Sequence, residues 1–225
     1  MDIDSQVVMF TGGRDSTLTA ALLMLRNIPV HLYTANSGCS VHRDVIQYRI
    51  TELKNKFGDL IISHTMADIS GTFRSISLEN IESDILKYKK NLILLGEKLA
   101  LHVHLVDFCL RNKIGIVNDG LSKYQESWPD QRNVAREFLQ IFMSSYNIDY
   151  NSPVYESSTS EAVVKYQLMQ LGLSNKPLEG STLFGDTFSV ADDNTILEYL
   201  KEKENLAHSH VNFLTQGLFK KFHNT

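Results

Sequence analysis

The fold is decided by residues 7–16, which read Val7-Val8-Met9-Phe10-Thr11-Gly12-Gly13-Arg14-Asp15-Ser16. The first four residues are apolar without interruption, which predicts a strand buried on both faces, as in a parallel sheet. Residues 17–27 are rich in Leu and Ala and stop before Pro29, which predicts a helix. A buried strand that turns through two glycines into a helix is typical of an α/β fold.

The same alternation of strand and helix continues along the chain. Further strands are predicted at 30–35, 60–63 and 114–117, and further helices at 45–57, 92–110, 134–146, 158–172, 196–206 and 213–222, with short helices around 77–87. Ser158 and Glu161 have the spacing of a capping box at a helix start. We therefore expect an open, mostly parallel, doubly wound α/β sheet with helices on both faces. Residues 1–172 would form this domain, and residues 173–225 a helical C-terminal extension of the same compact unit.

The composition excludes several classes of protein. The chain has 225 residues, a net charge of −4 and only two cysteines, Cys39 and Cys109. An acidic chain lacks a broad electrostatic surface for nucleic acid, and two cysteines cannot build a disulfide framework or a four-thiolate zinc site. The start of the chain lacks the basic flank of a signal peptide, and no apolar run approaches the roughly 18 residues of a membrane span. We expect a cytoplasmic protein without nucleic-acid or membrane partners, and a homodimer is compatible with the sequence.

The segment Thr11 to Ser16 is the sharpest chemical signal. Two glycines let the backbone turn tightly and approach a ligand, and the N–H groups at the following helix start form an anion site. Thr11 and Ser16 add hydroxyl groups, while Asp15 is better suited to hold a metal ion than to touch a phosphate. The alternative is a generic strand–helix turn, but six such residues between strand and helix favour a phosphate loop.

This segment resembles the Ser-Gly-Gly-x-Asp-Ser signature of the PP-loop ATP pyrophosphatases, with Thr11 in place of the first serine. The resemblance implies an adenine nucleotide alpha-hydrolase-like fold and a loop that binds the pyrophosphate of ATP. It also implies that a substrate oxygen attacks the α-phosphate and that AMP is then displaced. The ATP-binding residues would be Thr11, Gly12, Gly13, Arg14, Asp15 and Ser16, with Ala35 and Asn36 beside the nucleotide and Asp15 as the Mg²⁺ ligand.

Three further segments are similar to the 7-cyano-7-deazaguanine synthase branch of this superfamily. They are Ser40-Val41-His42, the Lys90-Asn91 pair before the helix at 92–110, and Trp128-Pro129-Asp130-Gln131-Arg132. The similarity covers about residues 6–172. It implies a 7-deazapurine carboxylate or a relative as substrate, bound by Lys90, Asn91, Asp119, Gly120, Trp128, Asp130 and Arg132, with Asp15, Ser16, Asp130 and Arg132 as catalytic residues.

The residues around Trp128 fit that assignment on their own chemistry. Asp119 and Gly120 end a predicted strand, where ligands bind in open parallel sheets. Trp128 offers a stacking surface for a planar base. Asp130 can accept hydrogen bonds from ring N–H groups, and Arg132 can bind a carboxylate or a phosphate. An ordinary surface loop around Pro129 is the alternative.

The chain also departs from that branch. Residues 173–225 contain no cysteine, so the four-cysteine zinc site of the branch is missing and no structural zinc is expected. No lysine follows Ser152-Pro153, and Lys89-Lys90 replace a Gly-Arg pair. These changes leave open a different nucleophile, a different acyl acceptor or a degraded catalyst.

The expected activity is that of an ATP-dependent C–N ligase that forms AMP and pyrophosphate. A carboxylate would be adenylated, and an amine, either small or on a protein, would convert it to an amide or a nitrile. A non-catalytic nucleotide- or partner-binding protein is the first alternative, and tRNA thiolation through Cys39 is the second. Two His pairs are weaker signals: His102 and His104 on a helix point apart, while His208 and His210 are predicted in a turn that could reach one metal ion.

Overall fold

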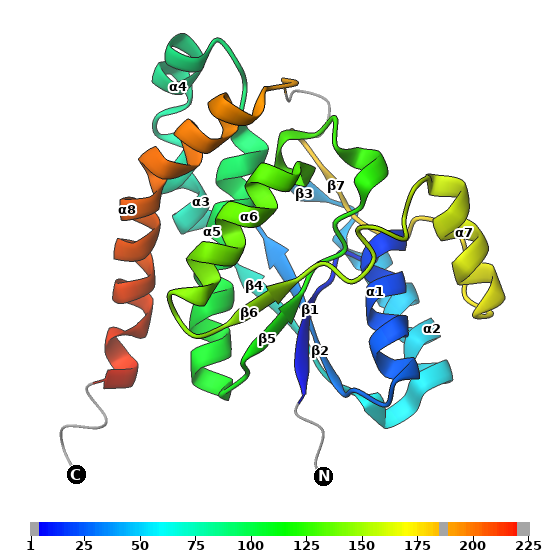
Figure 1. Cartoon of the computed structure of the whole chain (residues 1–225). Coiled ribbons are helices and arrows are strands. Elements are labelled where there is room, and N and C mark those ends of the chain that lie inside the picture. The colour runs from blue at the N-terminus through cyan, green and yellow to red at the C-terminus, as the bar shows by residue number, and fades with distance from the viewer. Residues whose placement is uncertain (1–4, 185–188, 220–225) are drawn as a thin grey trace.

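The computed structural model describes residues 5–184 and 189–219. Its centre is a five-stranded sheet in which every strand pair is parallel, with the order β4-β2-β1-β5-β6 (Figure 1). The strands of this sheet are β1 (Gln6–Met9), β2 (Val30–Asn36), β4 (Ile61–Asp68), β5 (Ile116–Asn118) and β6 (Asp149–Asn151). Two short antiparallel strands, β3 (Ser40–Val41) and β7 (Ser181–Thr182), form a separate pair.

Helices cover both faces of the sheet. Helices α1, α2 and α7 lie on one face, and α5, α6 and α8 lie on the other (Figure 1). The α-helices are α1 (Arg14–Leu25), α2 (Ile46–Phe57), α3 (Ser70–Phe73), α4 (Ile81–Tyr88), α5 (Ile93–Asn112), α6 (Asn133–Ser144), α7 (Glu161–Gln170) and α8 (Asp193–Phe219). Short helical turns are η1 (Arg43–Val45), η2 (Gly58–Leu60), η3 (Arg74–Leu78), η4 (Lys123–Gln125) and η5 (Pro129–Gln131). The predicted doubly wound α/β sheet is confirmed.

The first strand explains why its apolar run is continuous. Val7 and Met9 belong to the core cluster under α5, α6 and α8, whereas Val8 and Phe10 belong to the cluster under α1, α2 and α7. Alternate side chains of a strand point to opposite faces, so a strand covered by helices on both faces must be apolar at every position.

The direction of winding reverses between β1 and β5, which are neighbours in the sheet. β1 continues into α1 on one face, and the chain after β5 leads to α6 on the other face (Figure 1). The two turns touch: a Cβ at Gly120 would lie 2.6 Å from the backbone nitrogen of Ser16. In open α/β sheets this switch point at the carboxyl edge is where ligands bind.

Several elements differ from the sequence-based prediction. The helices expected at 196–206 and 213–222 form one helix, α8, and it contains the predicted turn with His208 and His210; residues 220–222 lie outside the described part. The third strand extends to Asp68, because β2 offers it a parallel partner over that whole length. Strands β3, β6 and β7 were not predicted; each is only two or three residues long and lacks an apolar run.

The capping box at Ser158 is also wrong. Helix α7 begins at Glu161, and Ser160 is its N-cap, because the Ser160 hydroxyl accepts a hydrogen bond from the Val163 N–H at 3.3 Å. Ser158 is instead fully buried. Over 5–184 and 189–219, no helix combines the length and the apolar character needed to cross a membrane.

Candidate functional site

The phosphate loop lies between β1 and α1 at the switch point. Gly12 has a φ of +82°, a left-handed conformation that favours glycine. Gly13 is the N-cap residue of α1, and no described side chain caps this helix start. The Thr11 hydroxyl accepts a hydrogen bond from the Gly13 N–H at 3.1 Å, and the Ser16 hydroxyl accepts one from the Thr11 N–H at 3.3 Å. The hydroxyls thus fix the loop, and the first turn of α1 keeps N–H groups for an anion.

Residues 174–184 cross this loop, and we call them the strap. The fully buried Arg49 of α2 donates to the carbonyl oxygens of Ser174 at 2.9 Å and of Lys176 at 2.5 Å. A Cβ at Gly12 would lie 2.1 Å from the carbonyl oxygen of Leu178. The strap backbone therefore packs directly on the loop backbone, and glycine is required at position 12 for space as well as for its φ.

Glu179 of the strap reaches the loop itself. The Thr11 hydroxyl donates to Glu179 Oε2 at 3.1 Å, and a Cβ at Gly13 would lie 2.2 Å from that same oxygen. A carboxylate thus occupies the N-terminal end of α1, where the helix dipole favours negative charge. Burial raises the pKa of Glu179 above its ordinary value, and the nearby Asp15 adds to this effect. Sequence reasoning missed Glu179, because no local pattern connects it to a loop more than 160 residues earlier.

Asp15 is positioned as a metal ligand would be. Its Oδ2 accepts a hydrogen bond from the Tyr124 hydroxyl at 2.8 Å, while its buried Oδ1 has no partner among the described residues. Burial raises the pKa of Asp15. The described ranges contain no group of three or more His, Cys, Asp or Glu side chains that could hold a metal ion. One carboxylate together with ATP phosphates is nevertheless a normal Mg²⁺ environment, so Asp15 fits that role.

Arg14 does not face the loop. Its Nε donates to the carbonyl oxygen of Asn175 in the strap at 2.7 Å, and its guanidinium pairs with Glu161 at the start of α7. The expectation that Arg14 binds the phosphates is not met in this arrangement, because the strap and α7 supply closer partners.

Ala35 and Asn36 are the last two residues of β2. Both are partly buried, and Asn36 Oδ1 accepts a hydrogen bond from the Gly38 N–H at 3.0 Å. The strap reaches this loop as well, since the Leu183 N–H donates to the carbonyl oxygen of Cys39 at 2.9 Å. The strap therefore covers both loops to which the sequence assigned ATP.

The turn after β5 holds a buried ion pair. Lys98 Nζ lies 3.1 Å from Asp119 Oδ2, and it donates to the carbonyl oxygen of Asp130 at 3.1 Å. The Tyr150 hydroxyl donates to the same Asp119 oxygen. Although burial alone would raise the pKa of Asp119, the Lys98 charge and the Tyr150 hydrogen bond hold it below its ordinary value. Lys98 was not among the predicted site residues; a lysine within a helix of mostly apolar residues was the available signal.

Asp130 lies next to this ion pair. Gln131 Nε2 donates to Asp130 Oδ2 at 2.9 Å, whereas the buried Asp130 Oδ1 and Gln131 Oε1 have no partner in the part of the chain that is described. Burial raises the pKa of the Asp130 carboxyl. Buried polar atoms are normally hydrogen-bonded, so two adjacent acceptors without donors indicate a place for water or for a ligand that carries N–H or O–H groups.

Trp128 and Arg132 do not behave as predicted. Trp128 is partly buried and packs against the hydrophobic core, so much of its ring surface is already covered. Arg132 Nε lies 2.7 Å from Asp193 Oδ1, at the first residue of α8. Arg132 therefore links the start of α6 to the C-terminal extension instead of standing free for an anionic substrate.

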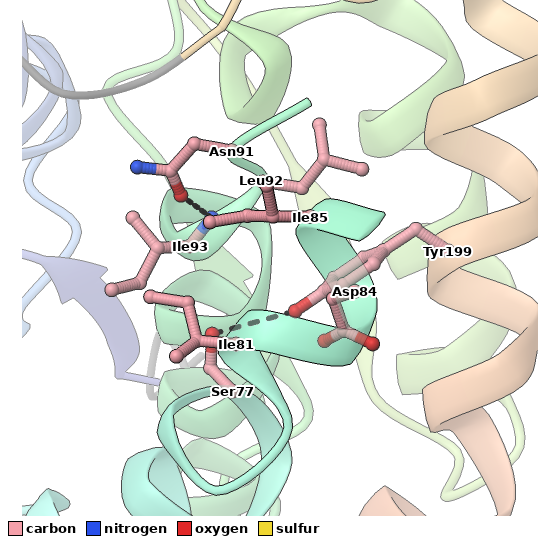
Figure 2. Close-up of a pocket in the computed structure, with 8 residues that line it drawn as sticks. All are labelled: Ser77, Ile81, Asp84, Ile85, Asn91, Leu92, Ile93 and Tyr199. Carbon is pink, nitrogen blue, oxygen red and sulfur yellow. Dashed lines mark hydrogen bonds between the residues drawn. The ribbon is translucent and has the colours of Figure 1, made fainter. Parts of the chain in front are cut away.

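Lys90 and Asn91 precede α5. Figure 2 shows Asn91 at a small pocket between α4, α5 and α8, where its Oδ1 accepts a hydrogen bond from the Ile93 N–H at 3.2 Å. The pocket is lined by Ser77, Ile81, Asp84, Ile85, Asn91, Leu92, Ile93 and Tyr199. The Asn91 backbone N–H also donates to the Ser189 hydroxyl at 2.9 Å. Asn91 thus has a structural role at the start of α5, and this pocket contains no residue of the phosphate loop.

His102 and His104, both on α5, have separate partners. His102 donates to the Lys98 carbonyl oxygen at 2.7 Å, and burial lowers its pKa to about 4. His104 instead contacts Thr72 at 2.8 Å, so the two rings do point apart. Burial raises the pKa of Cys39, and it raises that of Cys109 to about 12.

Comparisons with known proteins identify the fold. No family model and no curated protein matches the sequence. A 4-thiouridine synthetase, solved with RNA and ATP, matches with a TM-score of 0.61 and 11% identity over 95% of this chain; the match covers only 53% of that enzyme's length. NMN synthetase from Francisella tularensis matches with a TM-score of 0.52 and 16% identity, over 96% of this chain and 85% of its own. A predicted subunit of tRNA methyltransferase from Methanocaldococcus jannaschii matches with a TM-score of 0.46 and 20% identity, over 80% of this chain and 96% of its own.

The two synthetases match nearly the whole of this chain, over 95% and 96% of its length. What the chain shares with them at these identities is the fold: a parallel sheet between helices, with a C-terminal helix added. This chain therefore shares the α/β fold of these two synthetases.

Proposed function

We propose that the chain is an ATP-using enzyme that adenylates a carboxylate, releases pyrophosphate and passes the acyl group to an amine. One observation carries the proposal: the first turn of α1 touches the turn after β5, which holds the buried Lys98–Asp119 ion pair. The candidate anion site therefore lies next to a cluster of buried polar side chains, Lys98, Asp119 and Asp130, at the carboxyl edge of the sheet. In this cluster Asp130 Oδ1 has no hydrogen-bond partner among the described residues. Domain boundaries at 1–172 and 173–225 remain part of this proposal.

The reaction has two steps. In the first, a carboxylate oxygen attacks the α-phosphorus of ATP, the α–β phosphoanhydride bond breaks, and pyrophosphate leaves. In the second, an amine nitrogen attacks the acyl carbon, and AMP leaves with the oxygen that the carboxylate contributed. The amine loses a proton, which we assign to the buried Asp130 carboxyl, because its Oδ1 is free to accept one. Mg²⁺ at Asp15 would neutralise charge on the departing pyrophosphate.

The chain's own groups would act mainly by positioning. The N–H groups of the α1 first turn orient the phosphates. Lys98 holds Asp119 and the Asp130 backbone together, so it fixes the distance between the β5 turn and the loop at 128–132. A 7-deazapurine carboxylate fits the acceptors of Asp130 and Gln131, which can receive ring N–H groups.

The test is release of pyrophosphate from ATP in the presence of candidate carboxylates. We expect release that depends on the carboxylate and on Mg²⁺, and loss of release in Asp15→Asn. The matched control is Asp107→Asn, which changes an acid of α5 that pairs with Arg111 away from the loop. Absence of release with every carboxylate, in a protein that is folded and binds ATP, would contradict the enzymatic proposal.

A non-catalytic nucleotide-binding protein is the second candidate. The orientation of Arg14 and Arg132 toward other partners favours it, since neither cation faces the site. A rise in melting temperature with ATP but no turnover would select it. Thiolation is disfavoured, because a sulfur carrier needs an accessible thiolate, and the pKa values of both cysteines are raised by burial.

A further inference from the structure

We propose that Glu179 is an internal competitor for the phosphate loop, so that ATP binds only when its phosphates displace this carboxylate. The proposal rests on the proposed ATP binding and adds to it a control built into the strap. Glu179 Oε2 accepts the Thr11 hydroxyl at 3.1 Å and lies against Gly13, the N-cap residue of α1. This is the position that the loop geometry assigns to a phosphate oxygen. Two anions cannot occupy one helix N-terminus without mutual repulsion.

The backbone on either side of Glu179 is anchored. On one side, Arg49 binds two strap carbonyls, and Glu52 accepts the Ser174 N–H at 2.5 Å. On the other side, Ser181 and Thr182 pair with β3. We therefore expect rotation of the Glu179 side chain between these anchors to clear the start of α1 without unfolding of the strap.

The same strap also holds Arg14 away from the loop, through the hydrogen bond from Arg14 Nε to the Asn175 carbonyl oxygen. The arrangement thus places a negative group in the anion site and keeps a positive group outside it. Both features oppose binding of a polyanion. Displacement of Glu179 by phosphate would remove the first obstacle, and rotation of the Arg14 side chain away from the Asn175 carbonyl oxygen would remove the second.

Charged side chains of α1 and α2 face Glu179. Asp15 of α1 repels its charge, whereas Arg14 of α1 and Arg49 of α2 attract it. Burial raises the pKa of the Glu179 carboxyl, so protonation at lower pH weakens the competitor. Replacing the carboxyl with an isosteric amide removes the charge and keeps an oxygen for the Thr11 hydroxyl, which separates electrostatic competition from loss of shape.

The experiment is calorimetric titration of the full chain with a non-hydrolysable Mg–ATP analogue. We expect Glu179→Gln to bind about tenfold more tightly than the unaltered chain, which corresponds to about 1.4 kcal/mol. Glu179→Ala, which empties the position, should also bind more tightly. Glu198→Gln, on an exposed position of α8, is the matched control and should leave the affinity unchanged.

The outcomes separate the two proposals. Unchanged or weaker binding by both Glu179 variants, with measurable binding by the unaltered chain, overturns the competitor and leaves ATP binding intact. That result would mean that Glu179 assists the nucleotide or its metal ion. Failure of all the proteins to bind the analogue, with their melting temperatures unchanged, contradicts the proposed function itself.

Discussion

Replacement of Lys98 by methionine tests the buried ion pair at the turn after β5. The Lys98 and Asp119 side chains are only 9% and 11% exposed, and Nζ makes two contacts of 3.1 Å, one to Asp119 Oδ2 and one to the Asp130 carbonyl oxygen. Methionine keeps the length of the side chain but removes the positive charge. The buried Asp119 carboxylate then keeps the Tyr150 hydroxyl as a hydrogen-bond donor. Removing one partner of a buried pair costs about 3–5 kcal/mol, and for a chain of this size each kcal/mol lowers the melting temperature by about 2–4 °C.

The assay is urea denaturation at several pH values. The Lys98 charge now holds the pKa of Asp119 below its ordinary value. The ionised Asp119, paired with Lys98, therefore contributes to the free energy of unfolding above the unfolded-state pKa of about 3.9. This contribution is lost as the pH falls through the lower, folded-state pKa. Without Lys98, burial raises that pKa, so the destabilisation should grow as the pH rises above about 3.9. Lys123→Met is the control, because Lys123 forms an exposed pair with Glu156, and such pairs contribute at most about 1 kcal/mol. A loss for Lys98→Met no larger than for the control, or one independent of pH, would refute this reasoning.

Three further predictions concern the loop. Gly12→Ala should abolish nucleotide binding and lower the free energy of unfolding by more than about 1 kcal/mol, because φ at this position is +82° and the Leu178 carbonyl oxygen blocks a Cβ. Gly71→Ala is the control, since its Cβ would meet no atom within 4 Å; it should change neither property in the same titration and melting measurements. Asp15→Asn should keep or raise the melting temperature while the Mg²⁺-dependent affinity for ATP falls, because burial already disfavours the Asp15 charge; a large loss of stability would argue against the metal-ligand role. Burial raises the pKa of Glu179, so as the pH rises through that pKa the affinity of the unaltered chain for ATP should fall relative to that of Glu179→Gln, since deprotonation strengthens the competitor; parallel profiles of affinity against pH would argue against it.

The part of the fold that is visible in the sequence is the part that depends on local pattern. The apolar run at 7–10, the glycines of the loop and the helical spacing at 92–110 each report on burial or backbone conformation within a few residues. These features were sufficient to predict the parallel sheet and the position of the glycine loop at its carboxyl edge.

The parts that were missed depend on contacts between distant segments. Glu179 reaches Thr11, and Lys98 reaches Asp119 and Asp130, only after the sheet has formed. Arg14 and Arg132 were predicted to bind anions because of their position after strands, but Glu161 and Asp193 come from other helices and pair with them. A sequence pattern places a charged residue at the correct edge; it does not reveal which opposite charge tertiary packing brings there.

The most direct test of the central claim uses a candidate carboxylate labelled with oxygen-18 in turnover with ATP and an amine. If the carboxylate attacks the α-phosphorus, one labelled oxygen must leave in the phosphate group of AMP, and mass spectrometry of the AMP will detect it. We predict AMP that carries the label, with pyrophosphate as the other product. Formation of ADP and phosphate, or of AMP without the label, would contradict carboxylate adenylation by this chain.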